Sequence, residues 1–278
     1  MTQPRECALF TAATNLLLAA SGQGGEFQPP SIAEFFPTGF LFQGTAFEVN
    51  RIILVRVVTT LILCLLFVLA ARSARLVPGR GQNVAEMALD FVRVNIAQET
   101  LGHNARRFVP MLTTLFFAIF AFNITGIVPF LNIASTSLVG MPIVLALWVY
   151  VMYLAVGVRK FGLGGYLRNS LFPPGLPKVL YVLITPIEAL QVFVFRPATL
   201  ALRLTANMIA GHLILALCFT ATNFFLFEAS GVIKVFSAVS FAAGIAFTLF
   251  EVLVAVLQAY VFTLLSAVYL NMAVEEEH

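Results

Sequence analysis

A small set of polar and charged side chains lies inside the long apolar stretches of this 278-residue chain, where ion binding or ion movement is the chemistry they suit. They are Glu188, Thr199, Arg203, Asn207, His212, Glu251 and Gln258. An isolated charge in a membrane helix costs several kcal/mol and is by default a candidate for an ion path, a proton relay or a partner contact. Histidine suits proton transfer because its unperturbed pKa lies nearest to physiological pH.

Arg203 is the hardest of these residues to explain as a purely structural group. Apolar residues flank it, it lies far from either end of its stretch, and a guanidinium stays charged at any physiological pH. It therefore needs an anion, either in this chain, where Glu188 and Glu251 are the chief candidates, or in a partner protein. Thr199 and Asn207 lie four residues before and after it and so share its face of an α-helix.

Glu251 and Gln258 form a second polar stripe, because residues seven apart return to one helix face. His212 lies nine residues after Arg203, which turns it away from the Arg203 face and places it roughly 13 Å further along the axis. Across a helix hairpin this spacing favours His212 beside Glu251. It leaves Arg203 nearer Gln258. The histidine and the glutamate fit a structural ion pair as well as a proton relay.

Four polar residues also have ordinary structural interpretations. Asn207 and Gln258 are residue types that commonly join membrane helices by hydrogen bonds. Arg196 precedes Pro197 and could bind carbonyls that the proline leaves free. Glu188 could occupy a polar cavity or pair with Arg196. The residue types alone leave these alternatives open.

The composition predicts the solvent that surrounds these residues. The chain is 60% hydrophobic and only 10% charged, with a mean hydropathy of +0.96. So few charges cannot solvate a globular surface, which indicates an all-α polytopic membrane protein. The net charge of +3 is too small and too scattered to suggest nucleic acid. The three cysteines share no metal-ligand or disulfide spacing.

The hydrophobic pattern predicts about five membrane helices and one amphipathic surface helix. The spans are 52–71, 108–130, 141–158 and two long stretches, 178–222 and 232–272. Residues 82–101 alternate apolar and charged side chains at helical spacing, which is typical of a surface helix. Residues 1–50 form an extramembrane lead-in, 51–278 form a single membrane domain, and the turn-rich residues 162–175 form a loop.

The last two stretches are too long for upright spans. Some forty residues of helix reach roughly 60 Å, twice the ~30 Å hydrocarbon core. Each stretch is therefore either two spans or one long tilted helix. No polar turn interrupts them, which favours two long, strongly tilted helices that form a hairpin joined near 223–231.

The positive charges predict the orientation. Arg72, Arg75 and Arg80 follow the first span, which places that end in the cytoplasm and the N-terminus outside. An odd number of spans then puts the C-terminus, with the acidic tail 275–277, in the cytoplasm.

Two segments of the long stretches resemble the signature sequences of subunit a of the F-type ATP synthase. They are RPATLALRLTANMIAGH (196–212) and FEVLVAVLQAYVFTLLSAVYL (250–270), and their order and separation match that family. The segment VPGRGQNVAEMALDFV (77–92) is similar to the surface helix that follows the family's first span. The resemblance covers most of the chain from about residue 30 onward.

The resemblance implies a stator subunit of the Fo sector in a bacterial plasma membrane, with no catalytic site, metal or cofactor of its own. It implies a rotating ring of c subunits, the b subunits of the peripheral stalk, the rest of the synthase and lipid as partners. Two offset half-channels then carry protons to and from the ring. Arg203 matches the arginine that faces the ring carboxylate, with Asn207 and Thr199 around it. Gln258 matches the glutamine near that arginine.

Three further residues match the half-channel on the outer, proton-rich side. His212 and Glu251 match its coupled pair, in the order found in mitochondrial members; many bacterial members carry the two types the other way round. Glu188 corresponds to the family's channel glutamate, with an interval to Pro197 one residue longer than in several members.

Two other classes of function stay open at this point. One is a self-contained ion-coupled secondary transporter, although such folds usually show repeated halves and the sequence has no internal repeat. The other is a structural membrane scaffold, which predicts that Arg203 tolerates Lys or Gln with only a loss of stability. The sequence has no GxxxxGK[ST] phosphate loop, so ATP chemistry would belong to partner subunits.

Overall fold

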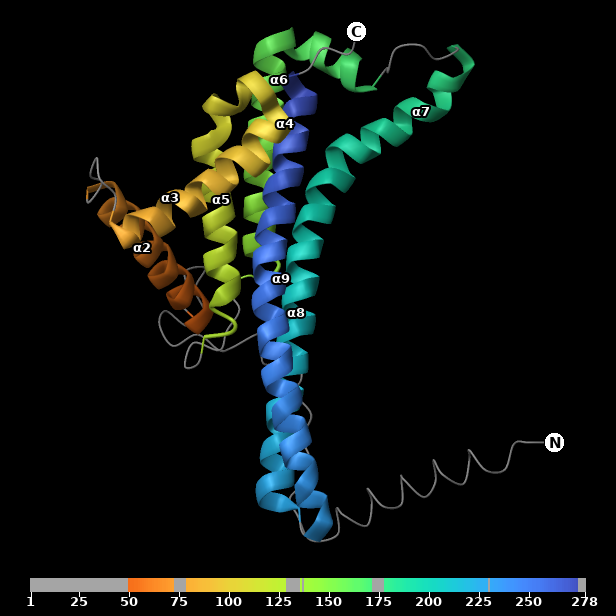
Figure 1. The fold of residues 1–278 in the computed structure, drawn as a ribbon. Helices are drawn as coiled ribbons and strands as arrows, with labels where there is room; N and C mark the ends of the chain where they lie inside the picture. Colours follow the sequence, from red (N-terminus) through yellow and green to blue (C-terminus); the bar gives the residue numbers. More distant parts are fainter. Residues whose placement is uncertain are drawn as a thin grey trace, which may run out of the picture. The chain divides into compact units, whose positions relative to one another are not determined.

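The computed structural model describes residues 50–72, 79–128, 136, 138–171, 178–229 and 231–274. The predicted lead-in, apart from Asn50, and the acidic tail 275–277 lie outside the described residues. The α-helices are α2 (Arg51–Arg72), α3 (Arg80–Val92), α4 (Glu99–Leu101), α5 (Ala105–Ile124), α6 (Gly140–Leu171), α7 (Lys178–Leu190), α8 (Arg196–Asn223) and α9 (Val235–Val274) (Figure 1). Between them lie the π-helical segments η2 (Arg93–Gln98), η4 (Gln191–Phe195) and η5 (Phe224–Glu228), and the 3-10 segments η3 (Gly102–Asn104) and η6 (Gly231–Lys234).

Five helical segments of the described residues are long and apolar enough to cross a membrane. They are Arg51–Arg72, Arg80–Ile124, Gly140–Arg168, Leu183–Glu228 and Gly231–Val274. The second joins the predicted surface helix to the predicted second span, which begins a little earlier than expected, at Ala105. The chain is therefore an all-α multi-pass membrane protein, and the prediction of about five membrane helices is confirmed.

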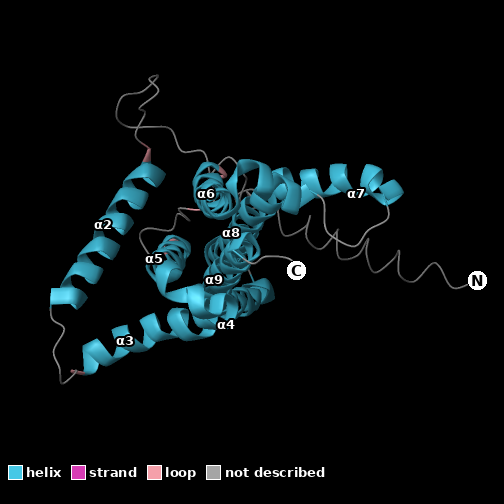
Figure 2. Ribbon diagram, turned by 90° about the horizontal axis from the view of Figure 1, so that it is seen from above, coloured by secondary structure: helices cyan, strands magenta, loops and turns pink. Residues whose placement is uncertain are grey.

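The described residues divide into two compact units. The first consists of 210–229 and 231–251, and the second of all the others. In the second unit α2 and α3 both lie against α5 (Figure 2). Its core contains the fully buried side chains Leu112, Leu115, Ile119, Val149, Leu204, Phe262 and Leu270. This core holds the part of α8 that carries Arg203 and the part of α9 that carries Gln258.

The predicted surface helix 82–101 is helical throughout, but the register changes within it. The α-helix α3 passes into the π-helical η2 at Arg93 and returns to an α-helix at Glu99. Val92, Ile96 and Ala97 are fully buried in the core that includes α5. The other apolar side chains, such as Val84 and Met87, stay exposed. The helix thus has two apolar faces, one against the protein and one directed outward.

The third span differs from the prediction. The helix α6 continues to Leu171, so residues 163–171, expected in a loop, are helical. Gly162 interrupts the helix with φ 72° and ψ 166°, a conformation that requires glycine. The helix then resumes, and the buried ring of Tyr166 packs where a Cβ on Gly157 would lie. The loop prediction was wrong because the glycines that favour a turn also permit this close return of the chain.

The two long stretches behave differently. The helix α9 is continuous over 40 residues, as expected for a single long helix. The stretch 178–222 is also helical throughout, but its register changes at the π-helical segment η4, and α7 and α8 run in different directions on the two sides of that segment (Figure 1). The strong tilt in the membrane stays a prediction.

A hydrogen bond from α6 stabilises the π-helical segment η4. The Arg196 N–H donates to the carbonyl of Gln191, five residues back. Pro197 has no N–H, so the Val192 carbonyl lacks the donor that the same register would give it. The Tyr153 hydroxyl donates to that carbonyl at 3.0 Å. The carbonyl freed by the proline is therefore satisfied by a tyrosine, not by Arg196.

Replacing Tyr153 by phenylalanine is expected to destabilise the chain by about 1–3 kcal/mol, because the buried Val192 carbonyl then has no donor. Thermal unfolding of the purified chain in detergent measures the loss. Tyr150→Phe is the matched control: its ring centroid lies 5.3 Å from that of Tyr153, but its hydroxyl makes no hydrogen bond to a described residue. Equal losses in the two variants would show that the Val192 bond contributes nothing.

Candidate functional site

A shallow pocket of about 520 Å³ opens between α8 and α9 in the second unit. Its lining is Arg203, Ala206, Asn207, Leu257, Gln258 and Val261. The Asn207 amide Nδ2 donates to Gln258 Oε1 at 3.4 Å and so joins the two helices. The structure therefore brings Arg203, Asn207 and Gln258 to one pocket, which is the arrangement that their helical spacing predicts.

Arg203 is directed away from the protein interior. Its side chain is exposed, as are Leu202 (60%), which precedes it in the sequence, and Leu257 (52%), which lines the same pocket. Among the described residues Arg203 has no ion pair and no hydrogen bond. A permanent cation on an apolar face of a membrane-crossing segment is costly unless an anion compensates it. None of the described residues supplies that anion.

Gln258 supplies a polar group on the α9 side of the same pocket. Only 6% of the residue is exposed, and its Nε2 has no hydrogen-bond partner among the described residues. Buried polar atoms in folded proteins nearly always have a partner, protein or water. The Asn207–Gln258 bond fits an interhelical role. Because Gln258 accepts this bond through Oε1, both of its amide hydrogens lack an acceptor among the described residues.

His212 and Glu251 belong to the first unit, where both are buried. The carboxylate of Glu251 lies against the backbone of Gly211, since a Cβ on that glycine would be 2.7 Å from Glu251 Oε1. Neither carboxylate oxygen accepts a hydrogen bond from a described residue. The structure thus places the carboxylate beside the residue that precedes His212. A buried carboxylate without a donor among the described residues is a position where an ordered water commonly binds.

The other two predicted site residues do not line the pocket. Thr199 is exposed on α8, and its hydroxyl donates to the carbonyl of Phe195, the last residue of η4, at 2.7 Å. Glu188 is half-buried on α7 and has no ion pair among the described residues. Arg196, the predicted alternative partner of Glu188, instead lies over the ring of Tyr269, with its guanidinium carbon 5.3 Å from the ring centroid.

Comparison with known proteins identifies the family. The sequence model of the ATP synthase A chain family matches residues 53–271. The chain belongs to this family. Over 255 residues it is 48% identical to ATP synthase subunit a of Rhodococcus erythropolis, which covers 91% of this chain and 93% of that protein. It is 36% identical over 276 residues to ATP synthase subunit a of a Nocardioides species, covering 97% of this chain and 100% of that protein.

The match extends beyond those two relatives. ATP synthase subunit a of Hyphomonas neptunium is 41% identical over 212 residues, or 76% of this chain and 81% of that protein. The family match includes the whole of α7 and α8 and most of α9, so all seven predicted site residues lie within it. The sequence resemblance to subunit a is confirmed.

Two residues that bear on the site were not expected from the sequence. Gly211 is the point of closest approach of Glu251, and Tyr153 holds the η4 segment between Glu188 and Arg196. For Gly211, the sequence offered one indication, namely its position directly before the candidate residue His212. Among the described residues no three His, Cys, Asp or Glu side chains gather in a way that could hold a metal ion.

Proposed function

We propose that this chain is the stator subunit a in the Fo sector of a bacterial F-type ATP synthase, and that it carries protons through two offset half-channels to and from a ring of c subunits. The observation that carries the proposal is Arg203, an exposed cation on an apolar face with no counter-ion among the described residues. The b subunits of the peripheral stalk and the rest of the synthase are its other partners. The plasma membrane is its location, with the N-terminus outside and the C-terminus in the cytoplasm.

Arg203 acts on the ring carboxylate in two ways. It stabilises the deprotonated carboxylate as each ring subunit passes the pocket, because an opposite charge favours the ionised form. Its fixed positive charge also repels protons and so prevents direct leakage from one half-channel to the other. Asn207 and Gln258 offer amide groups to the same carboxylate. Thr199 lies one turn before Arg203 on the same face of α8.

His212 and Glu251 form the proton path that leads to the ring from the outer side, with Glu188 as a further polar group. A proton that reaches the ring neutralises its carboxylate, which enters lipid only in that form. Rotation then carries the proton to the second half-channel, which opens to the cytoplasm. The membrane potential supplies about 2.3 kcal/mol per charge for each 100 mV, so several protons are needed for each ATP, which suits a rotating ring.

Reconstitution distinguishes this function from a self-contained transporter. The purified chain alone, in vesicles with an imposed pH gradient and membrane potential, is expected to move neither a solute nor protons above the rate of empty vesicles. ATP-driven proton pumping is expected only when the chain is combined with the ring, the stalk and the catalytic subunits. Solute transport by the chain alone would establish the transporter alternative.

Gly211 provides a test of the Glu251 position. Gly211→Ala is expected to lower ATP-driven proton pumping about tenfold, because the added methyl group displaces the carboxylate whose oxygen lies 2.7 Å from that point. Vesicle acidification followed with a pH-sensitive dye measures the rate. Gly140→Ala is the control, since a Cβ there meets no atom within 4 Å. If Gly211→Ala pumps protons as fast as the unaltered chain, the position of the Glu251 carboxylate does not matter for pumping.

A further inference from the structure

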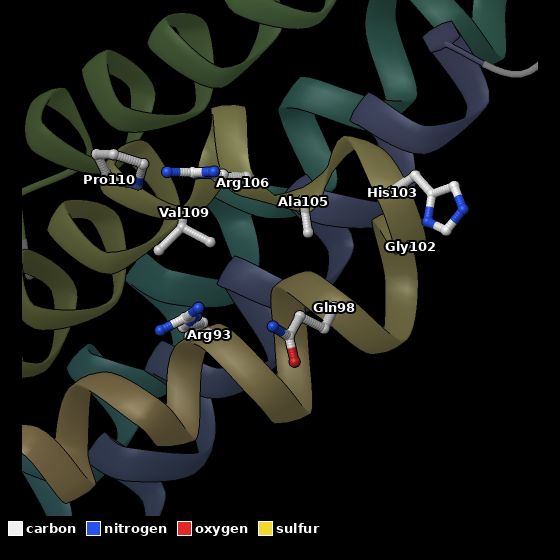
Figure 3. A pocket seen from close by; sticks show the side chains of 8 residues that line it. All are labelled: Arg93, Gln98, Gly102, His103, Ala105, Arg106, Val109 and Pro110. Atoms are coloured by element: carbon white, nitrogen blue, oxygen red, sulfur yellow. The ribbon is translucent and has the colours of Figure 1, made fainter.

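We infer that a second pocket, at the elbow where η2, α4 and η3 lead into α5, binds the phosphate of an anionic phospholipid headgroup. The pocket has a volume of about 490 Å³. Its lining is Arg93, Gln98, Gly102, His103, Ala105, Arg106, Val109 and Pro110 (Figure 3). It shares no residue with the Arg203 pocket, so the inference does not depend on the proposed half-channels.

The charge of this pocket is positive. Arg93 projects from one wall and Arg106 from the other, with Gln98 beside Arg93 and His103 at the rim (Figure 3). No Asp or Glu of the described part of the chain lines the pocket. Neither arginine has an ion pair or a side-chain hydrogen bond among the described residues. Two guanidinium groups from separate helical elements suit one phosphate, because each presents a planar fork of donors.

The backbone holds the two walls in place. Gly102 adopts φ 51° and ψ −121°, which lets the chain turn sharply from α4 into α5. Ile96 and Leu101 are buried in the core on the protein side of the elbow. The arginines therefore project from a packed turn and need little reorganisation to bind an anion.

The surroundings of the pocket favour a lipid over a free anion. Along α3 and η2, three apolar side chains at helical spacing are exposed, namely Val84, Met87 and Val94. Phe91, between them in the sequence, packs its ring against Phe116 and Tyr260 instead. This stripe ends next to Arg93, and Val109 and Pro110 add apolar surface inside the pocket. A basic pocket joined to an exposed apolar stripe matches an amphipathic ligand, with its phosphate at the arginines and its acyl chains along the stripe.

Lipid retention by the purified full-length chain tests the inference. Native mass spectrometry counts the phosphatidylglycerol and phosphatidylcholine molecules that remain bound after titration with each lipid. We expect preferential binding of phosphatidylglycerol, and a loss of affinity of about tenfold for each arginine removed in Arg93→Gln/Arg106→Gln. The matched control, Arg80→Gln/Arg107→Gln, removes the same charge from α3 and α5 outside the pocket and is expected to bind as the unaltered chain does.

A charge-retaining variant covers the case in which the glutamine variant does not fold. Arg93→Lys/Arg106→Lys is expected to keep the preference for phosphatidylglycerol over phosphatidylcholine with weaker binding. Inorganic phosphate at the same concentration is expected not to displace the lipid.

Three results would overturn the inference. The first is an equal loss in the Arg80/Arg107 control, which would mean a general charge effect. The second is displacement of the lipid by equimolar inorganic phosphate, which would assign the pocket to a free anion. The third is unchanged lipid binding in both Arg93/Arg106 variants. If the glutamine variant also loses a partner subunit from the assembled complex, the pocket binds a protein.

Discussion

Arg203→Ala is expected to abolish ATP-driven proton pumping in inverted membrane vesicles, with a loss of about a hundredfold or more. Truncating one partner of a desolvated charge pair costs about 2–5 kcal/mol, because the other charge is left unpaired. Here the unpaired group is the ring carboxylate. Without Arg203 nothing stabilises its ionised form as each ring subunit passes the pocket. Dye quenching during ATP hydrolysis measures the pumping rate.

The proton-pumping rate of Arg203→Lys distinguishes a role of Arg203 in proton transfer from a purely structural role. Lysine keeps a charge but lacks the planar fork and can lose its proton when it is desolvated. We expect Arg203→Lys to lose at least about tenfold in pumping while the complex still assembles. Arg159→Gln removes an exposed cation of α6 that is remote in sequence from the site and is expected to pump normally. Normal pumping by Arg203→Lys, with only a lower unfolding temperature, would support a structural role.

Glu251→Gln is expected to lower proton pumping on the order of a hundredfold, because glutamine keeps the shape of the side chain but cannot exchange a proton. The carboxylate is buried, and neither oxygen has a hydrogen-bond donor among the described residues. The amide therefore replaces it without breaking an observed contact. Pumping and assembly are measured together, so that a loss of rate with normal assembly identifies a defect in proton transfer.

Thr248→Val is the matched control for Glu251→Gln. Thr248 lies three residues earlier on α9 in the same unit, and its hydroxyl donates to the Gly244 carbonyl at 2.7 Å. Since that bond is local to the helix, its removal is expected to change the pumping rate by less than about twofold. A Glu251→Gln variant that pumps as fast as Thr248→Val would exclude the carboxylate from the proton path.

Helical spacing was enough to predict the arrangement around Arg203. Arg203 and Asn207, four residues apart, share one face of α8, and in a hairpin that face can meet Gln258 of α9. For that reason Arg203, Asn207 and Gln258 line one pocket in the structure. The composition likewise predicted the membrane class, because so few charges cannot solvate the surface of a globular protein.

The features that the sequence did not reveal depend on contacts between distant residues. The bond from Tyr153 to the Val192 carbonyl crosses 39 residues, and nothing near either residue signals it. The fit of Glu251 against Gly211 depends on how closely α8 and α9 approach each other in the first unit. The return of α6 after Gly162 was missed because glycine permits both a loop and a sharp break between two helical segments.

A structure of the assembled membrane sector tests most directly whether Arg203 faces a partner carboxylate. The proposed function predicts that the Arg203 guanidinium lies within about 6 Å of one ring carboxylate, directly or through a water, the range over which an opposite charge stabilises the ionised form. It also predicts that Asn207 and Gln258 line the same interface. An Arg203 guanidinium directed into lipid, or paired with Glu188 or Glu251 of its own chain, would contradict it.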